Sequence, residues 1–140
     1  MIRPAVPDDF GRLIALWLES AEKSHPFVPK AYWVDLVEEM RSVRLPYSET
    51  TVFVQGNHVV GFISTLDKHV LALYVESKAQ SQGVGRELLN QAKLRSSSLL
   101  LDVFSENERG FSFYQREGFV PVERHVDASG HELTSMEWKQ

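Results

Sequence analysis

The stretch that decides the fold is VLALYVESKAQSQGVG, which runs from Val70 to Gly85. Its apolar first half predicts a buried strand, and Gly83 and Gly85 mark a turn that opens a helix. Backbone N–H groups in the first turn of a helix have no intrahelical partner, and the helix dipole adds positive charge there. Glycines let the backbone approach an anion closely. The stretch therefore predicts a binding site for a phosphorylated ligand.

The glycine turn by itself leaves alternatives open. It lacks the Gly-Lys-Ser/Thr ending of a P-loop, which disfavours phosphoryl transfer. Leu88 stands where a dinucleotide-binding fingerprint needs its third glycine, and the turn follows a later strand than the first. A tight loop without any ligand is the remaining alternative.

Composition narrows the class of protein. A length of 140 residues with 43% hydrophobic content predicts a single domain over 1–140 with a sizeable core. The net charge of -4 disfavours nucleic acid as a partner. The absence of cysteine excludes disulfides, thiolate zinc sites and a cysteine nucleophile. Neither a membrane-spanning run nor a metal-ligand cluster is visible, so we expect no membrane partner, no metal and a cytoplasmic location.

Hydrophobic periodicity predicts a mixed α/β protein with a sheet of about seven strands and helices on its faces. Trp17 and Trp138 are assigned to packing. The expected strands are 1–5, 51–55, 58–66, 70–76, 99–104, 120–126 and 132–138, with 70–76 buried on both faces. The first expected helix begins near Pro7. Three further helices are expected over 31–43, 83–96 and 107–117, and the last of them ends at Gly118 as its C-cap.

A second motif, LDVFSENERGFSFYQREGF from Leu101 to Phe119, changes the interpretation. With the Gln80 to Gly85 turn, it resembles the GCN5-related N-acetyltransferase (GNAT) superfamily, which carries Q/R-x-x-G-x-G/A, then a strand, an Asn and a helix ending F-Y-x-x-x-G-F. The resemblance covers nearly the whole chain and extends to the short bacterial members of the YiaC and YjaB type. It implies a mostly antiparallel central sheet with about four flanking helices, acetyl-CoA as cofactor and acetyl transfer to an amine.

The resemblance also implies which residues hold acetyl-CoA. The backbone of the central strand would bind the pantetheine arm through Leu73, Tyr74 and Val75. The N–H groups of the turn would bind the pyrophosphate, namely those of Ser81, Gln82, Gly83, Val84, Gly85 and Arg86. Asn107 would hydrogen-bond the cofactor near its pantetheine or acetyl end.

Tyr114 is the expected catalytic acid. Acetyl transfer to an amine expels a thiolate, and a phenol with a pKa near 10 is protonated at neutral pH and can donate a proton to that sulfur. The alternative is a core tyrosine with a satisfied hydroxyl. Phe113 and Phe119 are expected in the core.

Asp102 is the first candidate for the base that deprotonates the amine. Strand alternation points it away from Leu101 and Val103, and related ribosomal-protein alanine acetyltransferases carry a glutamate base there. A structural carboxylate is an equally good interpretation. His69, His25 and Phe27 are weaker candidates for residues that contact the acceptor. The alternative for His69 is an ordinary surface histidine, and the alternative for His25 and Phe27 is a packed loop turn.

Because the chain has no cysteine for an acyl-enzyme intermediate, direct attack by the amine within a ternary complex is the simpler mechanism. The resemblance favours a primary amine of a protein lysine or peptide as the acceptor. Acidic residues on the first two helices would suit a cationic acceptor, namely Glu19, Glu22, Asp35, Glu38 and Glu39. The alternatives are a small-molecule amine acetyltransferase and an acyl-CoA-binding sensor without turnover. The sequence leaves open whether the protein is a monomer or a dimer.

Overall fold

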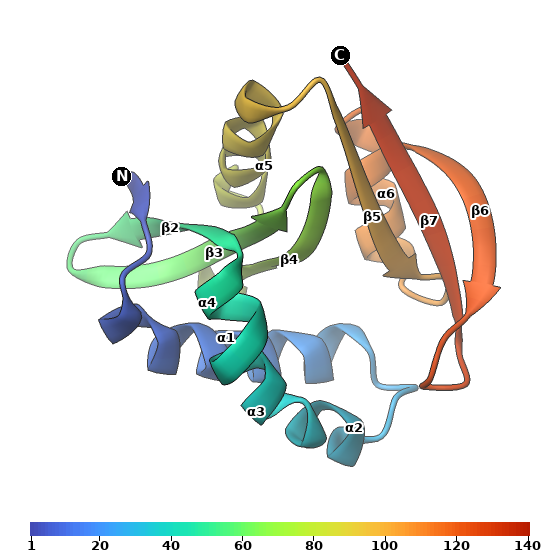
Figure 1. Ribbon diagram of the computed structural model, residues 1–140, viewed down its shortest axis with the longest axis horizontal. Helices are drawn as coiled ribbons and strands as arrows, with labels where there is room; N and C mark the ends of the chain where they lie inside the picture. Colours follow the sequence, from blue (N-terminus) through green and yellow to red (C-terminus); the bar gives the residue numbers. More distant parts are fainter.

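A seven-stranded sheet organises the protein in the computed structural model, which describes all residues 1–140 (Figure 1). The strand order is β1-β2-β3-β4-β5-β7-β6, and every neighbouring pair is antiparallel except β4–β5. This confirms the predicted mixed, mostly antiparallel sheet. The strands are β1 (Ile2–Pro4), β2 (Glu49–Gln55), β3 (His58–Leu66), β4 (His69–Val75), β5 (Ser98–Phe104), β6 (Val120–Val126) and β7 (Glu132–Lys139).

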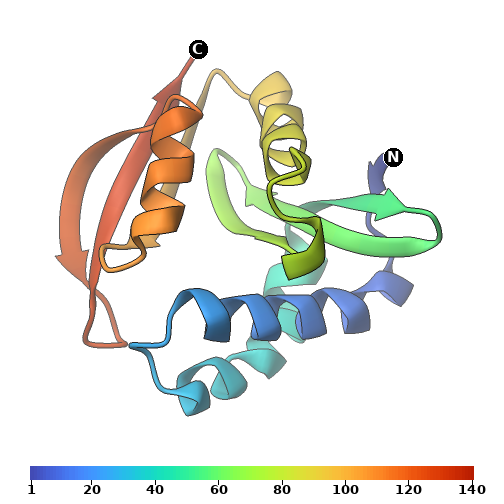
Figure 2. The ribbon, with the colours of Figure 1, turned by 180° about the vertical axis from the view of Figure 1, so that it is seen from behind.

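The helices form two groups on the sheet. Seen from behind, α5 (Val84–Arg95) stands over the β2–β4 half and α6 (Glu108–Arg116) over the β5–β7 half (Figure 2). The N-terminal group lies together on the other side. It comprises the short helix η1 (Pro7–Asp9), α1 (Phe10–Ser24), α2 (Lys30–Asp35), α3 (Val37–Glu39), the π-helical η2 (Met40–Arg44) and α4 (Leu45–Tyr47), and a further short helix, η3 (Ser77–Ala79), precedes α5.

The continuous helix expected over 31–43 was wrong. The segment is divided into α2, α3, η2 and α4, with Leu36 ending α2. The N–H of Leu45 bonds to the carbonyl of Met40, a π-type spacing. The next residue, Pro46, has no N–H with which to continue the α-helical ladder, which accounts for the change in pitch at this point.

β4 and β5 separate almost immediately. They share a single pair, His69 with Leu100. Opposite β3, Ser64 pairs with Ala72 and Thr65 with Val70, so Leu71 has no partner and forms a β-bulge. The expectation that 70–76 is buried on both faces was wrong, because Leu71 is exposed and the residues from Leu73 to Glu76 are only half-buried.

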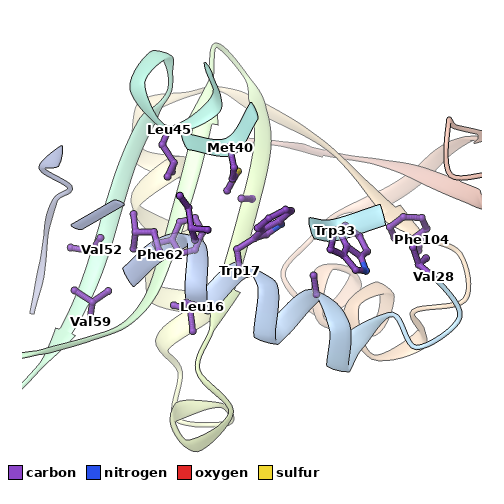
Figure 3. Packing of buried hydrophobic residues seen from close by; sticks show 14 of the residues in the cluster. Leu16, Trp17, Val28, Trp33, Met40, Leu45, Val52, Val59, Phe62 and Phe104 are labelled. Carbon is purple, nitrogen blue, oxygen red and sulfur yellow. The ribbon is translucent and has the colours of Figure 1, made fainter. Parts of the chain in front are cut away.

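Two apolar cores hold the halves of the sheet together. The first lies between the N-terminal helices and the sheet and includes Trp17, Trp33, Phe62 and Phe104 (Figure 3). The second lies beneath α5 and α6 and includes Leu88, Leu89, Val103, Phe119 and Met136. Trp138 packs against the second core, so the packing assignments of Trp17 and Trp138 are confirmed. No helix is both long and apolar enough to cross a membrane.

Candidate active site

The separation of β4 from β5 opens a cleft of about 420 Å³. It brings together most of the residues singled out from the sequence: His25, Leu73, Tyr74, Val75, Ser81, Gly83, Val84, Gly85, Arg86, Asp102, Asn107 and Tyr114. Gln82, Phe27 and His69 do not line it. His69 is an exposed residue at the start of β4, and Phe27 packs on the rings of His25 and Phe104.

One edge of β4 presents backbone groups to this cleft. The N–H of Glu76 bonds to the carbonyl of Val60 on β3. Because hydrogen-bonded and non-bonded positions alternate along an antiparallel pair, the backbone groups of Leu73 and Val75 point away from β3. The Gln80 side chain agrees with this direction, since its Nε2 donates to the Val75 carbonyl at 3.0 Å. By the same alternation, Tyr74 directs its backbone groups to β3.

The turn before α5 forms a concentration of free donors. Ser81 (φ 67°) and Gly83 (φ 83°) are both in left-handed conformations, and Gly83 is the N-cap of α5. The first helical bond of α5 runs from the N–H of Glu87 to the carbonyl of Gly83. None of the N–H groups from Ser81 to Arg86 has an acceptor within the protein. Such a nest at a helix N-terminus fits the diphosphate of an anionic ligand.

Two further cleft residues, Arg109 and Arg116, were missed in the sequence. They occupy the same face of α6 as Phe113, at spacings of four and three residues, so helical periodicity could have found them. Arg86 also lines the cleft, with its Nε 3.6 Å from Glu117 Oε1. The three guanidinium groups add positive charge to the cleft.

Tyr114 lies on α6 between the rings of Phe113 and Phe119 and lines the cleft. Burial, and secondarily the neighbouring Tyr74, raise the pKa of Tyr114 well above its usual range. Its hydroxyl is therefore protonated at neutral pH and available as a donor.

Asp102 faces away from Leu101 and Val103, as strand alternation predicts, and half of its side chain (52%) is exposed. Ser135 Oγ on β7 donates to Asp102 Oδ1 at 2.5 Å. His125 Nε2 on β6 lies 3.9 Å from Asp102 Oδ2. Neither partner was anticipated, because cross-strand neighbours depend on the register of β5, β7 and β6.

His25 is buried, and it touches the start of α6 across the cleft. Its Nδ1 lies 2.9 Å from the Ala21 carbonyl, and its Nε2 lies 3.3 Å from Asn107 Nδ2. Asn107 is the N-cap of α6, and its Oδ1 accepts the N–H of Gly110 at 3.0 Å. Burial lowers the pKa of His25, so the ring is neutral at pH 7.

The acidic residues proposed for the acceptor side do not line the cleft. Glu38 pairs with Arg41, and Glu39 with Arg44. Because Glu38 and Glu39 are paired with bases of their own segment, they offer less attraction to a cationic acceptor than the sequence indicated.

Comparison with known proteins gives the family. The model of the GNAT acetyltransferase domain matches residues 19–140. The chain is 32% identical to the peptidyl-lysine N-acetyltransferase YiaC of Escherichia coli over 88% of this chain and 85% of YiaC. It is 31% identical to the peptidyl-lysine N-acetyltransferase YjaB of Salmonella typhimurium, over 92% and 90%. The solution structure of apo-YjaB from Escherichia coli superposes with a TM-score of 0.87 at 28% identity, covering 99% and 96% of the chains.

The chain therefore belongs to the GNAT acetyltransferase family. Membership confirms the predicted family, enzyme class and cofactor: the protein is an acetyl-CoA-dependent N-acetyltransferase.

Proposed function

We propose that this GNAT enzyme acetylates the side-chain amine of lysine in proteins or peptides by direct attack on acetyl-CoA. The observation that carries the proposal is the cleft itself, which gathers a free strand edge, a nest of N–H groups and Tyr114 in one cavity. The lysine acceptor is supported by YiaC and YjaB, whose names describe peptidyl-lysine acetylation.

The cleft fits acetyl-CoA from its anionic end to its thioester. The nest from Ser81 to Arg86 takes the pyrophosphate, with Arg109 and Arg116 supplying further positive charge. The backbone groups of Leu73 and Val75 bind the amide-bearing pantetheine arm, in the manner of a peptide added to a sheet edge. The donor amide of Gln80 on Val75 then has to yield to the arm. Asn107 supports the end of the arm near the thioester.

The chemistry requires two proton movements. The neutral amine attacks the thioester carbonyl, the new C–N bond forms, and the C–S bond breaks. A backbone N–H on the free edge of β4 stabilises the charge that develops on the carbonyl oxygen. Tyr114 donates its hydroxyl proton to the departing sulfur, for which its protonated state equips it. Asp102 accepts the proton of the amine, directly or through water, while Ser135 holds its other oxygen.

Tyr114→Phe tests the acid directly. The variant is expected to bind acetyl-CoA with unchanged affinity and to lose about 100-fold or more in kcat, the usual contribution of a general acid. Thiol release in the presence of a lysine peptide measures the rate, and calorimetry measures the affinity. Phe113→Tyr, which places a hydroxyl on the neighbouring ring, is the control for a non-specific effect on α6. Full activity of Tyr114→Phe at neutral pH would refute the acid role.

The acceptor needs a separate measurement. Mass spectrometry of a lysine peptide, the same peptide with arginine for lysine, and a panel of polyamines, amino acids and aminoglycosides separates the alternatives. Acetylation confined to the lysine peptide supports the proposal. Acetylation confined to small amines would refute the lysine acceptor and leave the cleft assignments intact, whereas no turnover with any amine would point to an acyl-CoA sensor.

A further inference from the structure

The hydrogen-bond partners of the His25 ring determine which of its nitrogens carries the proton. A carbonyl oxygen can only accept, so the 2.9 Å contact with Ala21 places the hydrogen on Nδ1. In the neutral ring Nε2 is then an acceptor. The atom facing it, Asn107 Nδ2, is a donor at 3.3 Å. Ala21 thus selects the tautomer of His25 that can hold the Asn107 amide.

The other end of the amide is fixed independently. Asn107 Oδ1 accepts from the N–H of Gly110 at 3.0 Å, which requires that the oxygen, not the nitrogen, faces the helix. The two contacts therefore agree on one orientation of the amide. One N–H of Nδ2 and one lone pair of Oδ1 remain for a ligand in the cleft that Asn107 lines.

Packing holds both partners in place. His25 is 6% exposed, and its ring lies against the rings of Phe27, Trp33 and Phe104, with centroids 5.7, 5.3 and 4.9 Å away. Gly110 leaves the space that the amide fills, because a Cβ there would lie 2.6 Å from Asn107 Nδ2. The amide is therefore held between His25, in the turn after α1, and the first turn of α6, with its remaining donor and acceptor on the side of the cleft.

We infer that His25 is a positioning residue for acetyl-CoA binding: through Nε2 it fixes the Asn107 amide in the orientation that both caps α6 and faces the cofactor. This inference rests on the proposed role of Asn107 at the cofactor. It replaces the expectation that His25 contacts the acceptor, and it links the end of α1 to the helix that carries Tyr114.

A matched pair of amide substitutions tests the inference. The amide of Gln reaches the place of the Nε2 atom, whereas the shorter Asn reproduces only the Nδ1 side. Both remove the same aromatic ring, so packing loss is shared. His25→Gln should retain the affinity for acetyl-CoA better than His25→Asn, whose Kd should rise about fivefold relative to the glutamine variant, the equivalent of one neutral hydrogen bond. Because Tyr114 is untouched, kcat at saturating acetyl-CoA should be similar in the two variants.

Asn107→Ala completes the experiment. Asn107→Ala should weaken acetyl-CoA binding by itself. In this background, His25→Asn and His25→Gln should give the same Kd, because the side chain at position 25 no longer has an Asn107 amide to orient. Provided that Asn107→Ala weakens binding, either of two results would overturn the inference. One is an equal Kd for the two histidine variants when Asn107 is present, and the other is a difference between them that persists when Asn107 is replaced by alanine. An unchanged Kd in Asn107→Ala would instead refute the proposed role of Asn107, and the inference with it. Circular dichroism melts verify that each variant is folded.

Discussion

Gly110→Ala should separate stability from cofactor affinity, because the free energy of unfolding should stay nearly unchanged while the affinity for acetyl-CoA falls. Gly110 is an α-helical residue without a positive φ, so alanine should gain helix propensity of at most about 1 kcal/mol. The added Cβ would lie 2.6 Å from Asn107 Nδ2 and 3.0 Å from Cγ, so the amide must move away from its capping position. Loss of an N-cap costs about 1 kcal/mol. The net change in the free energy of unfolding should therefore be close to zero.

Cofactor affinity should nevertheless fall. A displaced Asn107 would lose the hydrogen bond that we propose it makes with acetyl-CoA, which corresponds to about a fivefold rise in the Kd. Gly11→Ala is the matched control, because Gly11 lies in the first turn of α1 and a Cβ there meets nothing within 4 Å. It should raise the melting temperature by about 3 °C and leave the Kd unchanged. Calorimetric titration and thermal melts on both variants decide the matter. A Gly110→Ala protein that is stabilised as much as Gly11→Ala and binds acetyl-CoA normally would refute the reasoning.

Other predictions follow from burial and backbone geometry. The pKa of His25 is lowered from 6.5 by burial, so below about pH 6.5 the unfolded chain binds a proton that the folded chain does not. The free energy of unfolding should therefore fall as the pH drops below about 6.5. Urea titrations should show a smaller fall for His25→Gln. Gly83→Ala (φ 83°) should cost about 1–2 kcal/mol of stability and weaken acetyl-CoA binding, whereas Gly56→Ala (φ 62°), in the β2–β3 turn, should cost stability alone, as melts and titrations will reveal. Gly61→Ala places a Cβ 3.1 Å from the Tyr74 carbonyl and should destabilise the protein by about 1–3 kcal/mol in denaturant unfolding.

The parts of the fold that follow from local rules could be predicted. The glycine turn before α5 has the left-handed Gly83 that its spacing indicated, and Gly118 (φ 97°) ends α6 as expected. The strands and α5 and α6 begin and end within about two residues of their predicted bounds, because apolar periodicity and turn residues decide them locally.

The parts that depend on distant contacts could not be predicted. The β-bulge at Leu71 arises from pairing with β3, and it removes the burial that the apolar sequence of β4 indicated. The amide of Asn107 fits against Gly110 and meets His25 in the turn after α1. Ser135 and His125 reach Asp102 only through the register of three strands. Each of these features depends on a residue from another strand or from the turn after α1, so no local pattern contains it.

The single residue pair between β4 and β5 affects how firmly the two halves of the sheet are joined. The two halves of the sheet share almost no backbone ladder, so side-chain packing carries most of their mutual stiffness. A pantetheine arm along Leu73 and Val75 would act as a temporary strand that supplies the missing rungs. Any ligand bound only by the folded state adds stability by mass action, about 2.7 kcal/mol at one hundred times its Kd. The free energy of unfolding of this protein should therefore rise with the concentration of acetyl-CoA around it.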